Sequence, residues 1–188
     1  MDAQTDEECA RQVKRGDHNA FGVLVDRYQE KLLRYGKRFL SAQEDVEDIV
    51  QDVFVSAYQK IKSFDPSQRF SPWIYRIAHN AFIDDLKKKT RSPFINMDFD
   101  ALLSHATGDE SVEKERDRKE MRVMIDKGLD RLSPKYREAI ILYYLEELSY
   151  KEIADVLQVP LGTVGARVKR AKEDLRDIYK KMDIDHGS

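Results

Sequence analysis

The sequence predicts an all-α protein of two small helical domains joined by a flexible linker. Glycine and proline are scarce, with 8 and 5 in 188 residues, which favours helices over strands and turns. Apolar side chains recur at the three- and four-residue spacing of amphipathic helices through most of the chain. Ser-Pro pairs and capping boxes precede several of these stretches, as is typical of helix N-termini.

We expect the two domains at residues 1–91 and 113–188, with the linker at 92–112. Ser92-Pro93 ends a helical pattern, because the residue before a proline disfavours the helical conformation. The following stretch mixes Pro, Asn, Ser, Gly and Asp without a sustained period. Each domain would be small, so each buries a limited fraction of its surface.

The first half contains cap signals that define its expected elements. In order, we expect a helix from an Asp17 cap towards Phe39, a helix opened by the Ser41–Glu44 capping box, a loop over Phe64–Phe70, and a helix starting at Ser71-Pro72.

The second half follows the same pattern. The expected elements are a charged helix over Val112–Leu132, a buried central helix that starts at Ser133-Pro134 and contains Ala139–Leu145, a short helix opened by the Ser149–Glu152 capping box and ended by Gln158-Val159-Pro160, and a last helix over Gly162–Lys181.

Composition excludes several classes of protein. No apolar run reaches about 18 residues, so we expect no membrane span. The acidic N-terminal segment lacks the apolar core of a secretory signal. Cys9 is the single cysteine, so neither an internal disulfide nor a cysteine-rich zinc site is expected. We therefore predict a cytoplasmic protein without a cofactor, in which Cys9 is either inert or a redox sensor.

Charges are segregated although the chain is nearly neutral, with 33 basic and 35 acidic residues. Residues 69–91 hold six basic side chains against two acidic ones, and residues 161–181 hold seven against three. The segment 43–54 holds five acidic side chains and no basic one. This segregation indicates two different kinds of partner.

Ser149 to Lys172 has the layout of a helix-turn-helix, in which Ile153, Ala154 and Leu157 would pack against Val164 and Val168. The N-terminal part of the second helix enters the DNA major groove in this motif. The alternative is a helical hairpin with a solvated basic face. Gly165 costs about 1 kcal/mol in a helix interior, and it either permits close approach to DNA or weakens the helix. The candidate DNA contacts are Thr163, Ala166, Arg167, Lys169, Arg170 and Lys172.

A second candidate surface mixes aromatic and basic residues, as a site for unstacked bases requires. The aromatic side chains would supply faces for stacking, and the cations would hold the backbone. The alternative is that the aromatics form the domain core, which we consider a stronger alternative for Trp73 than for Phe64 and Phe70. The candidates are Phe64, Arg69, Phe70, Trp73, Arg76, Asn80, Lys87 and Lys88.

The acidic segment forms the polar side of an amphipathic helix. A catalytic metal would need ligands converging from several elements, so no metal site is expected. Two interpretations of the acidic segment remain: a solvated helix face and a docking surface for a basic protein. The candidate docking residues are Asp45, Glu47, Asp48, Gln51 and Asp52.

At these positions the sequence resembles the bacterial RNA polymerase sigma factors of the small, two-domain extracytoplasmic function (ECF) type. The segments that carry the resemblance lie in the family's order and cover nearly everything except the first residues and the linker. They are Glu47–Phe54 (EDIVQDVF), Phe64–Asn80 (FDPSQRFSPWIYRIAHN), Ile83–Lys88 (IDDLKK), Leu132–Arg137 (LSPKYR), Leu148–Ala154 (LSYKEIA) and Pro160–Val164 (PLGTV). Two departures are Gly165-Ala166, where the family often has Lys-Ser, and Lys87, where Arg is usual.

The resemblance implies a role for each surface. The residues around Asp48, Gln51 and Asp52 would dock on the clamp helices of the largest subunit of core RNA polymerase. The Phe64–Lys88 region would recognise and melt the -10 promoter element, and the Thr163–Lys172 helix would read the -35 element. The second domain would also contact the flap of the second-largest subunit. The linker would run towards the active-site and RNA-exit channels, and an anti-sigma factor is an implied partner.

Two other classes remain as alternatives. A helix-turn-helix regulator that acts without polymerase, such as a response regulator, would need an α/β receiver, and the first 90 residues show no alternating strand pattern. A nuclease would need a convergent catalytic set. The chain contains neither a nucleophile–base pattern nor a glycine loop for phosphate, so we do not expect an enzyme.

Overall fold

The computed structural model describes residues 4–40, 42–90 and 124–186, and all regular elements in these ranges are helices. The all-α prediction is therefore confirmed. The helices belong to two compact units, one containing α1 to α4 and the other containing α7 and α9. The expected linker at 92–112 and most of the expected charged helix lie outside the described residues. A helix over 124–130 is the described part of the latter.

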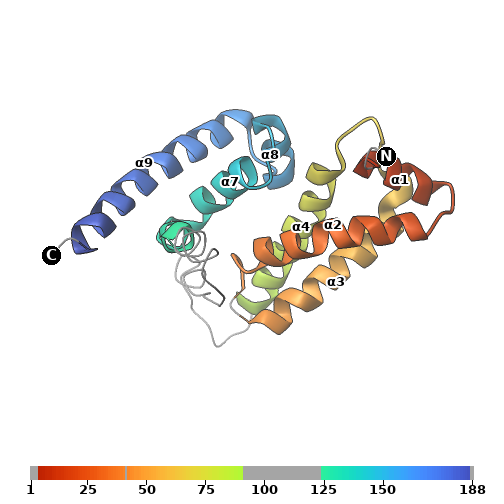
Figure 1. Cartoon of the computed structure of the whole chain (residues 1–188), viewed down its shortest axis with the longest axis horizontal. Helices are drawn as coiled ribbons and strands as arrows, with labels where there is room; N and C mark the ends of the chain where they lie inside the picture. Colours follow the sequence, from red (N-terminus) through yellow and green to blue (C-terminus); the bar gives the residue numbers. More distant parts are fainter. Residues whose placement is uncertain (1–3, 41, 91–123, 187–188) are drawn as a thin grey trace. The chain divides into compact units, whose positions relative to one another are not determined.

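The described residues from 4 to 90 of the first unit form four α-helices and one short 3-10 turn (Figure 1). Their bounds are Asp6–Lys14 for α1, Asn19–Gly36 for α2, Gln43–Lys60 for α3, Ile61–Ser63 for η1 and Phe70–Thr90 for α4.

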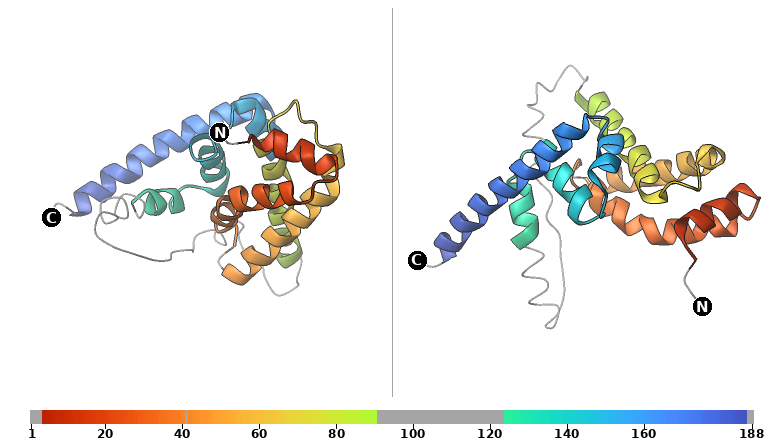
Figure 2. Two further views of the ribbon diagram at one scale, coloured as in Figure 1. Left: turned by 45° about the vertical axis from the view of Figure 1, so that its right-hand side comes forward. Right: turned by 90° about the horizontal axis from the view of Figure 1, so that it is seen from above.

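The apolar faces of these helices meet in one core. Leu24 and Leu32 of α2, Val46 and Val53 of α3 and Ile74 of α4 are all fully buried. Figures 1 and 2 show α2 and α3 side by side. The core thus comes from the apolar stripes that the sequence pattern identifies.

Helix α1 was not expected from the sequence analysis. Thr5 is its N-cap, and the Thr5 hydroxyl accepts a hydrogen bond from the Glu8 amide at 3.2 Å. Asp6 joins α1 to α2, because its carboxylate accepts hydrogen bonds from Arg27 and from the Tyr28 hydroxyl, each at 2.6 Å. Burial and the hydrogen bond to Asp6 raise the pKa of Tyr28. Helix α1 is therefore an integral part of the first unit.

Cys9 of α1 is completely buried. Burial raises the pKa of its thiol, which keeps the side chain in the protonated and less reactive form. The interpretation of Cys9 as an inert core residue is therefore favoured over a redox sensor.

Three expected helix starts in the first unit differ from the structure. The N-cap of α2 is His18, while Asp17 accepts a hydrogen bond from the Asn19 amide at 3.0 Å. Ala42 is the N-cap of α3, and Ser41 lies outside the described residues. Helix α4 begins at Phe70 rather than after Ser71, because a carboxylate from α1 serves its first amide, as described below.

The second unit contains α7 (Pro134–Tyr144), α9 (Leu161–His186) and the part of α8 (Tyr150–Leu157) up to Ala154. Helix α9 packs along α7 and continues past it towards the C-terminus (Figures 1 and 2). Pro134 is the first residue of α7, as expected, but the Ser133 side chain makes no cap hydrogen bond. The core of this unit is formed by Ala139, Ile140, Ile141, Leu142, Leu148, Ile153, Val164, Val168 and Ala171.

The central helix is less buried than the sequence predicts. Tyr144 and Leu145, at the C-terminal end of the expected apolar stretch, are 55% and 56% exposed. The prediction of an all-round buried helix is correct for Ala139–Leu142 and wrong for this end. Helix α9 packs against α7, but more than half of the surface of Tyr144 and of Leu145 remains exposed.

Candidate nucleic-acid interface

Helix α4 presents a stripe of side chains that combines an aromatic, a cation and an amide. Trp73 is half-buried, whereas Arg76 and Asn80 are exposed. Their spacing of three and four residues places them on one face of the helix. Arg69 is exposed in the loop directly before α4. These four predicted site residues therefore lie at one end and along one side of α4.

Phe64 and Phe70 do not share this exposure, and the expectation that they offer open ring faces is wrong for this conformation. They are 2% and 0% exposed. Their rings pack on each other at 5.4 Å between centroids, and both pack on Trp73. Phe70 also meets Tyr28 of α2 edge-to-face. The core interpretation applies to these two phenylalanines, and Trp73 is the aromatic of the cluster that remains partly open.

Helix α1 holds the loop between η1 and α4 at both ends. The Lys14 ammonium group donates a hydrogen bond to the Phe64 carbonyl at 2.8 Å. The Phe70 amide donates to the Glu7 carboxylate at 2.9 Å, so an acidic side chain satisfies one of the free amides at the start of α4. Within the loop, a hydrogen bond from the Ser67 amide lowers the pKa of Asp65. The loop is therefore fixed in one conformation by its own turn and by α1.

Lys87 and Lys88 are exposed at the C-terminal end of α4. Lys87 lies 3.5 Å from Asp84 of the same helix. Their neighbour Lys89 serves the fold instead, because its ammonium group lies 2.6 Å from Asp45 and 3.0 Å from Asp85. Partial burial by itself lowers the pKa of Lys89, but the hydrogen bonds to the two carboxylates outweigh it and the net shift is upward.

Some side chains of the acidic face of α3 make contacts within the protein, and others are exposed. Asp45 is engaged by Lys89, and Glu47 accepts a hydrogen bond from Gln43 at 2.7 Å. Asp48, Gln51 and Asp52 are exposed on the same helix. Of the five expected docking residues, these last three are therefore the ones that remain available to a partner.

The helix-turn-helix forms as the sequence predicts. The Ser149–Glu152 capping box is confirmed by its two reciprocal hydrogen bonds, at 2.7 and 3.3 Å. Gln158 follows α8 with a φ of 52°, the left-handed conformation that commonly ends a helix. Helix α9 then starts at Leu161, and the amides of Thr163 and Val164 donate hydrogen bonds to the Pro160 carbonyl at 2.9 and 3.3 Å.

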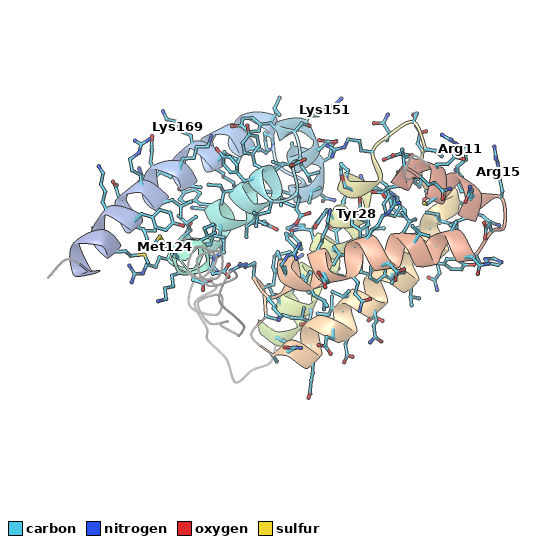
Figure 3. All side chains as sticks on the ribbon, in the orientation of Figure 1. Arg11, Arg15, Tyr28, Met124, Lys151 and Lys169 are labelled. Carbon is cyan, nitrogen blue, oxygen red and sulfur yellow. The ribbon has the colours of Figure 1, made fainter. Side chains whose placement is uncertain are left out.

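The α9 side chains that are predicted to contact DNA differ in how exposed they are. Val164 and Val168 are completely buried and fix the orientation of the helix. Thr163 and Arg167 are half-buried, while Ala166, Lys169 and Arg170 are exposed. Figure 3 shows Lys169 pointing away from α7 on the outer side of α9.

Lys172 makes a contact that the sequence analysis missed. Its ammonium group lies 5.3 Å from the ring centroid of Tyr143 and 5.1 Å from that of Tyr144. Hydrogen bonding with Tyr144 raises the pKa of Lys172. A cation over an aromatic face stabilises the charged side chain there. Lys172 therefore links α9 to α7 in this conformation instead of projecting freely from the helix.

The fold of the protein does not require glycine at position 165. A Cβ atom there would meet the Tyr150 ring at 3.7 Å, an ordinary van der Waals distance. Close packing inside the protein therefore does not explain the residue. The two explanations from the sequence, close approach to DNA and a weaker helix, both remain.

The comparisons with known proteins agree on one family for both units. The model for Sigma-70 region 2 matches residues 24–92, and that for Sigma-70 region 4 matches residues 122–175. ECF RNA polymerase sigma factor SigW of Bacillus subtilis is 36% identical over 172 residues, which cover 88% of this chain and 92% of SigW. The chain belongs to the ECF RNA polymerase sigma factors.

Other members of the family show similar likeness to this sigma factor. The ECF sigma-E factor of Escherichia coli is 35% identical, covering 90% of this chain and 91% of its own. The RNA polymerase sigma-H factor of Pseudomonas aeruginosa is 34% identical, covering 90% and 91%. The sequence resemblance to this family is therefore confirmed.

Two solved structures share the fold of this sigma factor. CnrH, in complex with the cytosolic domain of CnrY, matches with a TM-score of 0.67 and 28% identity, covering 95% of this chain and 99% of CnrH. The sigma factor RpoE of Bartonella quintana, in complex with the anti-sigma factor NepR, matches with a TM-score of 0.65 and 26% identity, covering 85% and 96%.

The described parts of this sigma factor contain two further negative findings. Between residues 4 and 186, outside the gaps at 41 and 91–123, no helix is long and apolar enough to cross a membrane. The same ranges contain no group of three or more His, Cys, Asp or Glu side chains arranged to hold a metal ion.

Proposed function

We propose that this ECF sigma factor binds core RNA polymerase and directs promoter-specific transcription initiation. Helix α4 reads and melts the -10 element, and α9 reads the -35 element. The single observation that carries the assignment is the stripe of half-buried Trp73 and exposed Arg76 and Asn80 beside a fixed loop, in a chain that also presents a capped helix-turn-helix. The first surface suits unstacked bases, and the second suits a major groove.

The proposal extends to location and partners. We place the protein in the cytoplasm, without enzymatic activity of its own. An anti-sigma factor is a proposed partner, supported by the solved complex of the similar RpoE with NepR. The second unit would contact the flap of the second-largest polymerase subunit, and Tyr144 and Leu145 provide exposed apolar surface for such a contact.

The test is a run-off transcription assay with purified core polymerase on genomic fragments. We expect discrete transcripts that appear only when this chain is added. A chain that binds duplex DNA but yields no new transcript would instead be the polymerase-independent regulator considered from the sequence.

Changing Asp48 and Gln51 together to lysine is expected to weaken binding to core polymerase. The open acidic face of α3 would then repel a basic docking surface. A pull-down with core polymerase in the absence of DNA measures the effect. Asp84→Lys, an exposed charge reversal on α4, is the matched control and should leave core binding unchanged. Equal retention of the double variant and the wild type would remove the docking role.

Arg167→Ala is expected to weaken binding to a -35 duplex by about 1–3 kcal/mol if Arg167 reads a base. The variant should also discriminate less between the -35 sequence and a changed one. Fluorescence anisotropy with both duplexes measures the two affinities. Lys180→Ala, an exposed cation further along α9, serves as the control. An equal loss on both duplexes would show that Arg167 contacts phosphate.

Trp73→Ala is expected to impair promoter opening more than duplex binding, because stacking contributes about 1–3 kcal/mol per base. Permanganate reactivity of the -10 thymines in the holoenzyme complex measures opening. Trp73→Phe retains a stacking face and should restore most of the reactivity. Circular dichroism checks that both variants fold, since Trp73 also packs on two buried phenylalanines. Normal reactivity in a folded Trp73→Ala protein would contradict the stacking role.

A further inference from the structure

The cations on the outer side of α9 are paired with carboxylates of the same helix. The Arg170 Nε atom lies 3.1 Å from Asp174 Oδ1, and Arg170 Nη1 lies 3.7 Å from Glu173 Oε2. The Lys169 ammonium group lies 4.0 Å from Glu173 Oε1. Two of the expected DNA-contacting cations therefore already have anionic partners one turn further along the helix.

These pairs are poorly placed to stabilise the helix. Lys169 and Arg170 are 79% and 59% exposed, and Glu173 is 44% exposed, so water and salt screen the interactions. The cation precedes the carboxylate in every pair, which is the less favourable order along a helix. The stability of the helix therefore does not explain why carboxylates stand at positions 173 and 174.

The same carboxylates oppose contact with the DNA backbone. A phosphate that binds Lys169 or Arg170 must replace Glu173 or Asp174 as the partner, and the displaced carboxylates then remain within a few ångströms of the phosphate. Like charges at such a distance repel each other, most strongly at low ionic strength. Arg167, one turn earlier, has no ion pair among the residues that the structure describes.

We propose that Glu173 and Asp174 are built-in competitors of the DNA backbone, which lower the affinity of α9 for DNA of any sequence. The inference rests on the proposed function of α9 as the DNA-reading helix. The carboxylates would weaken contacts of Lys169 and Arg170 with the DNA backbone, and backbone contacts carry no sequence information. The guanidinium N–H groups of Arg167 remain available to donate hydrogen bonds to a base edge. The two carboxylates thereby raise the fraction of the DNA-binding free energy that depends on the DNA sequence.

The test compares the full-length wild type with Glu173→Gln, Asp174→Asn and the double variant. Binding to a fluorescently labelled duplex of random sequence is followed by anisotropy over a series of salt concentrations. We expect the double variant to bind roughly 10-fold tighter at low salt, with a difference that shrinks as salt screens the charges. Its affinity should also fall more steeply with salt, because more counterions are released.

Asp177→Asn is the matched control. It removes the same charge from an exposed position on α9, and Asp177 has no ion pair within the described ranges. We expect its affinity to rise by less than about 2-fold. An equal gain in Asp177→Asn and Glu173→Gln would show a general effect of net charge and would overturn the inference.

Two further variants separate this inference from the proposed function. Lys169→Ala and Arg170→Ala should each weaken binding of the wild-type chain to the random duplex. If they do so while the double carboxylate variant binds like the wild type, competition is refuted and the role of α9 stands. If neither these variants nor Arg167→Ala changes DNA binding, the proposed role of α9 and the inference fail together. Circular dichroism confirms folding of every variant.

Discussion

Arg137→Met is expected to lower the free energy of unfolding of the second unit by about 2–4 kcal/mol. Arg137 is the single buried charged residue in the described part of the chain, at 4% exposure. Its Nη2 atom donates to the carbonyls of Asp130 and Leu132 at 2.8 and 3.2 Å, and Nη1 lies 3.7 Å from the Asp130 carboxylate. Methionine fills similar space but leaves these three acceptors without the guanidinium group.

The measurement separates the two units. Trp73 is the single tryptophan of the chain and belongs to the first unit, so its fluorescence in urea reports that unit. Far-ultraviolet circular dichroism reports both units. Arg137→Met should shift the dichroism transition and leave the Trp73 transition in place. Arg131→Ala, at an exposed position nearby, should change neither. An unchanged dichroism transition in Arg137→Met would contradict the structural role of this arginine.

Gly36→Ala is expected to destabilise the first unit by about 1–3 kcal/mol through overpacking. A Cβ atom at position 36 would clash with Phe82 Cζ and would lie 2.7 Å from Val46 Cγ1. Both neighbours are themselves completely buried, so the ring and the valine have little space to withdraw. The last residue of α2 is therefore glycine because α3 and α4 approach its backbone closely.

Gly22→Ala provides the matched control in the same helix. Apart from its chain neighbours and the nearby backbone of its own helix, no atom lies within 4 Å of a Cβ placed at Gly22, and alanine is the better helix former by about 1 kcal/mol. The two glycine variants should therefore shift the Trp73 fluorescence transition in opposite directions. Equal shifts for both would show that helix propensity, rather than the contact with Phe82, governs position 36.

Local signals in the sequence predicted much of the fold. The Ser149–Glu152 capping box and the Pro134 helix start need residues only a few positions apart, and the structure contains both elements. The missed helix α1 had a comparable signal. Thr5 is followed three residues later by Glu8, the spacing of a capping box, and the Thr5 cap is present. The short helix escaped notice because it has few apolar residues.

The errors in the candidate site arise from contacts between distant residues. Phe64 and Phe70 flank a polar loop and were expected to be open, but both are buried, with Trp73 against both rings and Tyr28 of α2 against Phe70. Asp45 and Lys172 were expected to face partners, but Lys89 and two tyrosines engage them. A helical pattern identifies which residues share a face, but it does not identify what lies against that face.

The sequence by itself determined the all-helical class, the helix-turn-helix and the family, because caps, spacing and motifs are properties of neighbouring residues. The tertiary structure decided which candidate side chains remain available. The hydrogen bonds from Lys14 to Phe64 and from Phe70 to Glu7 span 50 and 63 residues, and the one from Lys89 to Asp45 spans 44. Such contacts exist only after the chain has folded, so burial and pairing were settled by packing rather than by local pattern.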